Sequence, residues 1–265
     1  MKKAIVALQI IRAVRIGMIV AIAAAFLASC KKEKTDPPSV TTTEKKLVEI
    51  RNITEPSDIL KYKYDGQQRI TRRESQNSFY DFQYLPGKII ITTTRKSDNT
   101  MSSKQEFLLD ATGRATQTTA TNAIGETTRT DYITYDAEGW LASFKSVYPD
   151  GGNTELKIVT SGGNPTEEHN YDNGVLQTVT KYSYDPNGKN YNCVSMVLLT
   201  CGIKGLYGND SKNIAAGIKI YSSTGVLISE TTVTNVLDAD GYLSKLTYFS
   251  PMTGQKREFE YFYNK

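Results

Sequence analysis

The sequence predicts an all-β protein, an antiparallel meander of roughly 12–14 short strands rolled into a barrel-like sheet. Two observations carry this prediction. The 265 residues include 17 Tyr and 31 Thr but one Trp and one His, and tyrosine and threonine favour strands. Apolar and polar residues also alternate with a period of two, in stretches joined by Asp-x-x-Gly turns. Because a meander of that many strands cannot stay flat, the sheet is expected to curl or close.

Residues 1–29 have the layout of a signal peptide. Four basic residues and no acidic one precede an apolar run at residues 16–27. This run is shorter than the roughly 20 residues that cross a bilayer as a helix. We therefore expect residues 1–29 to be removed from the mature protein.

The apolar run ends in Leu27-Ala28-Ser29-Cys30, which resembles the lipobox of bacterial lipoproteins. In that family the cysteine is acylated and becomes the first residue of the mature chain. The resemblance implies that Cys30 is the lipid attachment site and that the membrane is contacted through this N-terminal lipid. In some bacteria, lipoproteins with an aspartate directly after the cysteine stay in the inner membrane. Here that residue is Lys31, so the resemblance implies an outer membrane lipoprotein. Whether it faces the periplasm or the cell surface is left open.

The mature chain is expected to be nearly neutral. The formal charge of +4 equals the four basic residues of the signal peptide, so their removal leaves a net charge of zero. A neutral chain gives no electrostatic reason to bind nucleic acid. Residues 30–47 are charged and contain proline without apolar periodicity, which predicts a flexible tether. The remaining residues, 48–265, are predicted to form one domain.

The domain is predicted to be an array of hairpins. In the first, Leu60, Tyr62 and Tyr64 share one face and Lys61 and Lys63 the other. Asp bonds its own backbone in such turns, and Gly supplies the positive φ that closes them. The same alternation places Trp140, Ala142 and Phe144 on one face, and Phe259, Tyr261 and Tyr263 on another.

Two resemblances follow from these hairpins. Tyr62-Lys63-Tyr64-Asp65 and Ile133-Thr134-Tyr135-Asp136-Ala137-Glu138-Gly139 resemble the YD repeats of RHS-type proteins, which build hairpin shells. The lipobox, the hairpins and Gly208-Asn209-Asp210-Ser211-Lys212-Asn213-Ile214 together resemble an uncharacterised family of bacterial lipoproteins, a domain of unknown function with a porin-like fold. That resemblance implies a barrel-like fold in an extracytoplasmic setting and no known activity.

Residues 189–217 interrupt the hairpin pattern. They have an apolar centre, Met196-Val197-Leu198-Leu199, and no Asp-x-x-Gly turn, which predicts a short helical or irregular insertion inside the barrel or at one mouth. The insertion either fills the core or gates a ligand cavity. Cys193 and Cys201 lie within it: on a helix they would be about 12 Å apart and remain free thiols, whereas in a loop they can form a disulfide.

The titratable residues give little sign of catalysis. His169 lies in a polar, turn-rich segment and is expected to be a solvated loop residue, and one His with two spare Cys does not make a zinc site. Asp238-x-Asp240-Gly241 lacks essential ligands of a calcium loop and is interpreted as a turn. No cofactor is expected. Trp140 and the tyrosines either pack in the sheet or stack on sugars.

The favoured function is that of a lipid-anchored envelope protein with a non-enzymatic binding or structural role and an unknown ligand. A glycan or another envelope protein is the expected partner. The alternative is an envelope hydrolase that acts on glycans through carboxylates. A transmembrane barrel ranks third, because the predicted strands run near 7 residues and spanning strands need about 9–11.

Overall fold

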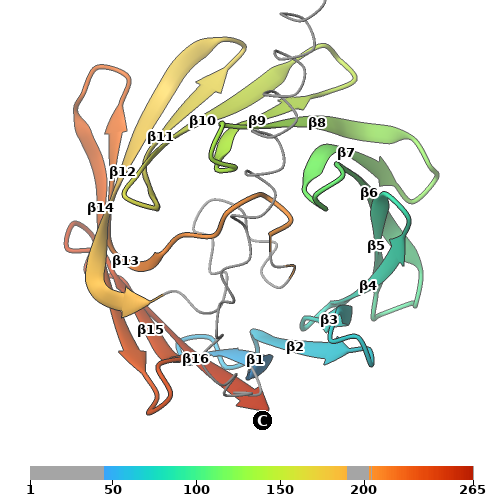
Figure 1. Cartoon of the computed structure of the whole chain (residues 1–265), viewed down its shortest axis with the longest axis horizontal. Helices are drawn as coiled ribbons and strands as arrows, with labels where there is room; N and C mark the ends of the chain where they lie inside the picture. The colour runs from blue at the N-terminus through green and yellow to red at the C-terminus, as the bar shows by residue number, and fades with distance from the viewer. Residues whose placement is uncertain (1–44, 190–202, 204, 265) are drawn as a thin grey trace, which may run out of the picture. The chain divides into compact units, whose positions relative to one another are not determined.

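The protein is a closed antiparallel barrel of sixteen strands (Figure 1). The computed structural model describes residues 45–189, 203 and 205–264. The strands are Lys46–Asn52 (β1), Ile59–Tyr64 (β2), Ile70–Glu74 (β3), Ser78–Leu85 (β4), Lys88–Arg95 (β5), Met101–Leu109 (β6), Ala115–Asn122 (β7), Thr127–Tyr135 (β8), Leu141–Val147 (β9), Asn153–Ser161 (β10), Asn164–Asp172 (β11), Val175–Lys189 (β12), Asn213–Ser222 (β13), Leu227–Leu237 (β14), Leu243–Phe249 (β15) and Lys256–Asn264 (β16).

Each strand pairs with its neighbours in the chain, and β1 closes the ring against β16. Residues 45–265 form one compact unit that contains every one of these strands and the closing pair, so the barrel is complete without any earlier residue. The predicted barrel-like meander is confirmed. Among the residues with described structure, no helix is long and apolar enough to cross a membrane.

The predicted strand count was too low because some hairpins lack the Asp-x-x-Gly signal. Strands β10 and β11, for example, are joined by Gly162 and Gly163, both with positive φ, and no aspartate lies in that turn. The predicted strand length of about 7 residues was also too short. Eight of the sixteen strands have nine residues or more, so strand length does not argue against a spanning barrel.

The Asp-x-x-Gly turns share one hydrogen-bond pattern. In the turn between β6 and β7, Asp110 Oδ1 accepts bonds from the backbone N–H of Thr112 at 2.8 Å and of Arg114 at 3.0 Å. Gly113, at φ +86°, donates its N–H to the Asp110 carbonyl. The same Asp-to-backbone pair occurs in the turns of Asp136 and Asp238. It also occurs in the Asp65 turn, where Gln68 at φ +67° stands in the place of the glycine.

Three of these turns, those of Asp65, Asp110 and Asp238, contact the following hairpin through a tyrosine. The Arg114 guanidinium lies 4.4 Å from the ring centroid of Tyr135, and the Tyr135 hydroxyl donates to the Ala115 carbonyl at 2.6 Å. Equivalent tyrosine-to-carbonyl bonds join Tyr64 to Leu47, Tyr184 to Pro165 and Tyr263 to Leu243. The Tyr-Asp motif thus stabilises contacts both within a hairpin and between successive hairpins.

Residues 203 and 205–212, which we call the inner segment, lie within the ring of strands (Figure 1). Their backbone is bonded to the hairpins of one end: Ala115 N–H donates to the Leu206 carbonyl, and Asn209 N–H donates to the Gly139 carbonyl. We call this end of the barrel the near end and the opposite one the far end. The sequence predicted a helical or irregular insertion, and the inner segment is irregular. Residues 190–202 and 204 of the predicted insertion lie outside the described residues.

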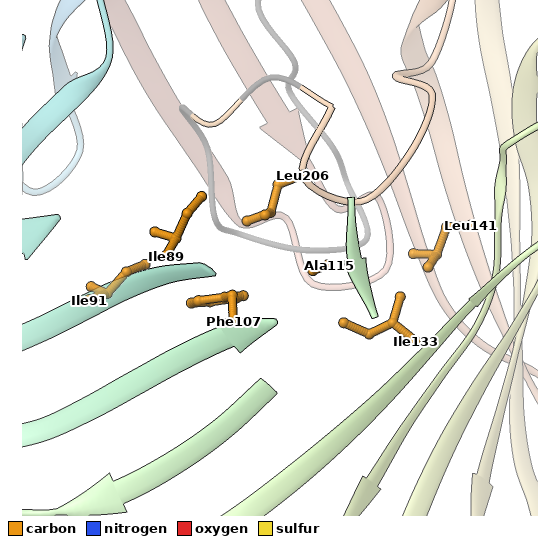
Figure 2. Close-up of a cluster of buried hydrophobic side chains, with 7 residues drawn as sticks. All are labelled: Ile89, Ile91, Phe107, Ala115, Ile133, Leu141 and Leu206. Carbon is orange, nitrogen blue, oxygen red and sulfur yellow. The ribbon is translucent and has the colours of Figure 1, made fainter. Parts of the chain in front are cut away.

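Leu206 of the inner segment shows which face of the sheet points inward. It is 1% exposed and lies in one cluster with inward side chains of β5 to β9 (Figure 2). The cluster members are Ile89, Ile91, Phe107, Ala115, Ile133, Leu141 and Leu206. Since side chains alternate along a strand, the residues between these positions point outward.

The outward face is charged. Oppositely charged side chains of neighbouring strands form ion pairs on it, with N–O distances of 2.6–3.2 Å: Arg72–Asp81, Lys88–Glu106, Lys181–Glu167, Lys219–Glu230 and Lys245–Glu258. A lipid-facing barrel wall is apolar, and a charged residue at its centre costs about 2–4 kcal/mol. The outer wall therefore has the chemistry of a surface in contact with water.

Candidate functional site

The inner wall differs between its near and far halves. Along β5 to β9 the near half is apolar and packs around Leu206. Towards the far end, the same strands present polar and charged side chains. The polar or charged residues of the inner wall that are buried include Thr118, Asp131, Ser146, Glu168 and Thr180. A sixteen-stranded barrel is wide enough to leave a lumen, so this polar half is the candidate functional site.

Asp131 of β8 is 1% exposed and belongs to a small polar network. Ser146 Oγ donates a hydrogen bond to its Oδ1 at 2.7 Å, and Arg129 Nε lies 2.8 Å from the same oxygen. Burial raises the pKa of Asp131, while Ser146 and Arg129 oppose that rise. Both contacts come from side chains of the wall itself and reach Oδ1, whereas Oδ2 is buried without a hydrogen-bond partner among the described residues. The fixed Oδ1 suits a structural role better than proton transfer.

Glu168 of β11 is the second buried carboxylate of the inner wall. Burial raises its pKa to about 7, and a hydrogen bond with Tyr182 of β12 partly offsets that rise. The Glu168 side chain therefore changes charge near neutral pH. It adjoins Ile158 and Thr180 across its two neighbouring strands.

Asp131 and Glu168 are too far apart to act as a glycosidase pair. They lie on β8 and β11, three strands apart, which amounts to about 14 Å of wall at 4.7–4.9 Å per strand. The two carboxyl groups of glycosidases lie about 5–9.5 Å apart. This pair gives no support to the alternative of a carboxylate hydrolase.

A cavity of about 340 Å³ opens in the inner wall across β3 to β6. Its far row consists of four residues that are direct cross-strand neighbours: Arg73, Tyr80, Thr93 and Ser103. Its near row consists of Phe82, Ile91 and Gln105, which are likewise paired across β4 to β6. The cavity is therefore polar towards the far end and mainly apolar towards Leu206.

The structure corrects the expected setting of His169. The residue lies within β11 rather than in a loop, and it points outward because it follows the inward Glu168. Its Nε2 is 3.0 Å from Glu167 Oε2. Hydrogen bonds from His169 and Lys181 lower the pKa of Glu167. His169 thus belongs to an ion-pair group on the outer wall.

The carboxylates of the Asp238 turn contact a lysine. Asp238 accepts bonds from the N–H groups of Asp240 and Tyr242 at 2.9 Å, and its carboxylate lies 2.8 Å from Lys45 Nζ. Within the described ranges, no three His, Cys, Asp or Glu residues are grouped so that they could hold a metal.

The predicted lipid site lies outside the described residues. This applies to Cys30 and to the lipobox residues Leu27, Ala28 and Ser29, and equally to Cys193 and Cys201. Their predicted roles stay predictions. The sequence-based reasoning in turn missed Arg73, Asp131 and Glu168, because it gives no sign of which polar strand residues point inward.

The solved structures that resemble the described fold include two porin-like proteins for which the match covers most of both chains. A porin-like protein from Bacteroides uniformis ATCC 8492 matches with a TM-score of 0.64 and 15% identity, over 82% of this chain and 95% of that chain. The fold is porin-like. A porin-like protein from Bacteroides vulgatus ATCC 8482 matches with a TM-score of 0.60 and 15% identity, over 82% and 98% of the two chains.

The likeness extends to the fold and no further at this level of identity. No known protein family matches the sequence, and no curated protein does either. The fold implied by the resemblance to porin-like lipoproteins is confirmed, whereas membership of such a lipoprotein family stays a prediction. What this porin-like barrel can bind depends on the side chains of its own inner and outer walls.

Proposed function

We propose that this protein is a non-enzymatic binding module of the bacterial cell envelope, held at the outer membrane by lipid on Cys30. The observation that carries the proposal is the contrast between the two walls. The outer wall carries ion pairs between neighbouring strands, whereas the inner wall combines an apolar part with a polar part and contains a cavity. Such a barrel suits a ligand taken up from water into the lumen.

Lipid anchoring supplies the membrane attachment in this proposal. The lipobox resemblance at Cys30 supports it, and the charged outer wall makes insertion of the barrel itself costly. The proposal covers either face of the outer membrane. It needs no cofactor, and the glycan or protein partner expected from the sequence stays a prediction.

The anchoring half of the proposal is tested by Cys30→Ser. The variant is expected to leave the membrane fraction and appear in the soluble fraction after cell lysis, because no acyl chain is attached. Ser29→Ala is the matched control: it keeps a small residue before the cysteine and should stay with the membranes. A Cys30→Ser protein that sediments with the membranes as the wild type does would contradict the proposal.

The part of the proposal that concerns the barrel is tested with residues 45–265 alone. Purified in buffer without detergent, this unit is expected to be monodisperse and to show the circular dichroism of a β-protein. The physical reason is the charged outer wall. Aggregation that only detergent reverses would instead support the hypothesis of a membrane-spanning barrel.

A further inference from the structure

The cavity across β3 to β6 has the size and the shape of a ligand site. Its volume of about 340 Å³ is at the lower end of the range for small-molecule sites, about 300–1,000 Å³. It lies on the inner wall, because Ile91 belongs both to its lining and to the cluster around Leu206. A ligand there would be enclosed by the sheet on one side and open to the lumen on the other.

Arg73 supplies a positive charge at the far row of this cavity. Its guanidinium lies 4.1 Å from the ring centroid of Tyr80, which fixes its plane. Its Nε is buried and has no hydrogen-bond partner among the described residues. No ion pair joins Arg73 to any residue of the described ranges, whereas its neighbour Arg72 points outward and pairs with Asp81 at 2.6 Å.

A buried donor without a partner is costly, and its cost is removed when an acceptor reaches it. A carboxylate is the acceptor that best matches a planar guanidinium, because it can take two parallel N–H bonds. The hydroxyls of Thr93 and Ser103 lie in the same cross-strand row. They add further polar groups beside the position that such an anion would occupy.

The near row requires that the rest of the ligand be apolar. Phe82 and Ile91 form it together with Gln105, and Ile91 continues into the apolar cluster around Leu206. A fully hydrated ion such as inorganic phosphate would leave this row uncovered. An organic body placed over Phe82 and Ile91 would bury it.

We propose that this cavity binds a small organic monocarboxylate, with its carboxylate at Arg73 and its apolar body over Phe82 and Ile91. Gln105, Thr93 and Ser103 offer hydrogen bonds to polar substituents of that body. The inference rests on the proposed function as a binding module and names the chemical class of its ligand.

The test measures binding of 4-phenylbutyrate to residues 45–265 by titration calorimetry, with 4-phenylbutan-1-ol as the neutral counterpart. The barrel unit is used because its sheet closes without the earlier residues. The acid is expected to bind about tenfold or more tightly than the alcohol, since only the acid forms charge-assisted bonds with Arg73. Equal affinities for acid and alcohol would overturn the proposal on the wild-type protein alone.

Two variants then locate the site. Arg73→Gln is expected to weaken binding of the acid about tenfold or more and to leave binding of the alcohol unchanged. Arg72→Gln is the matched control, one residue away on the outer wall, and should bind the acid as the wild type does. Loss of binding in both variants, or in neither, would overturn the placement at Arg73.

A parallel thermal-shift series separates failure of this inference from failure of the proposed function. It uses inorganic phosphate, neutral oligosaccharides and peptidoglycan fragments under the same conditions. One of these compounds could raise the melting temperature equally in the wild type and in Arg73→Gln while the acid raises neither. That result would support the binding module and contradict the carboxylate inference. If neither the acid nor any of these compounds binds, the result contradicts both the binding module and the carboxylate inference.

Discussion

The near and far halves of the inner wall are built from the same strands yet have opposite chemistry. On β5, Ile89 joins the cluster around Leu206, whereas Thr93 lines the cavity. On β6, Phe107 and Ser103 differ in the same way. The residues that hold the barrel together therefore meet those that face a ligand at Ile91, which belongs to both sets, and the polar row lies one inward position further along each strand. Substitutions of Arg73, Thr93 or Ser103 in the polar row should change binding without unfolding the protein.

The largest effect that separates the two halves is expected from Phe107→Ala. Phe107 is 1% exposed in the apolar half, and such truncations cost about 3–5 kcal/mol in the free energy of unfolding. Gln105→Ala, two residues earlier on the same face of β6, is expected to change stability by about 0.5 kcal/mol or less. Urea unfolding of both variants measures the difference. Equal losses would show that the lumen is packed uniformly, against the division into halves.

The next effect is a pH dependence from the far half. Burial raises the pKa of Glu168 from its usual 4.5 to about 7. Between these pH values the folded protein keeps a proton that the unfolded chain has released, so stability is full below pH 4.5 and declines as pH rises to 7. The decline is on the order of 3 kcal/mol, because one pKa unit corresponds to about 1.4 kcal/mol.

Glu168→Gln should remove this decline. In urea unfolding, the free energy of unfolding of the variant should rise relative to that of the wild type as the pH increases from 5 to 8. Glu167→Gln is the control on the outer wall. The pKa of Glu167 is lowered by its partners, so its contribution is present at neutral pH and is lost on acidification. A parallel pH profile for wild type and Glu168→Gln would show that the Glu168 carboxylate is as well solvated as one on the surface.

The smallest effect concerns two tyrosine hydroxyls. Tyr135 donates to the Ala115 carbonyl at 2.6 Å in the near half, and Tyr135→Phe is expected to cost about 1 kcal/mol. The Tyr80 hydroxyl in the far half makes no hydrogen bond to a residue with described structure, so Tyr80→Phe should be close to neutral. Thermal unfolding of the two variants provides the comparison, and a greater loss for Tyr80→Phe would contradict it.

Local patterns were enough to predict the fold class and several faces of the sheet. The alternation at Leu60, Tyr62 and Tyr64 is confirmed, since Tyr62 is 5% exposed and the lysines between them are exposed. The alternation predicted for Trp140, Ala142 and Phe144 is wrong. A register shift next to Thr134 and Tyr135 places Leu141 on the inner face together with Phe144. A bulge of this kind reverses the faces without any mark in the sequence.

The candidate site could not be predicted, because it depends on register across strands. Arg72 and Arg73 are adjacent and identical in type, yet one pairs with Asp81 outside and the other faces the cavity inside. A shift of one residue would exchange them. The polar row at Arg73 is assembled from four strands, and no single segment of the chain carries its pattern.

The pairing of β1 with β16 has a consequence for how the chain folds. Lys46 lies opposite Asn264, so the first and last strands of the barrel are neighbours in space and far apart in sequence. Contacts between such distant segments form slowly, because a long loop must first be closed. β16 is synthesised after the other fifteen strands of the barrel, so closure of the ring is expected to be a late step of folding. A chain that stopped before Lys256 would keep two unpaired strand edges, each a template for another chain.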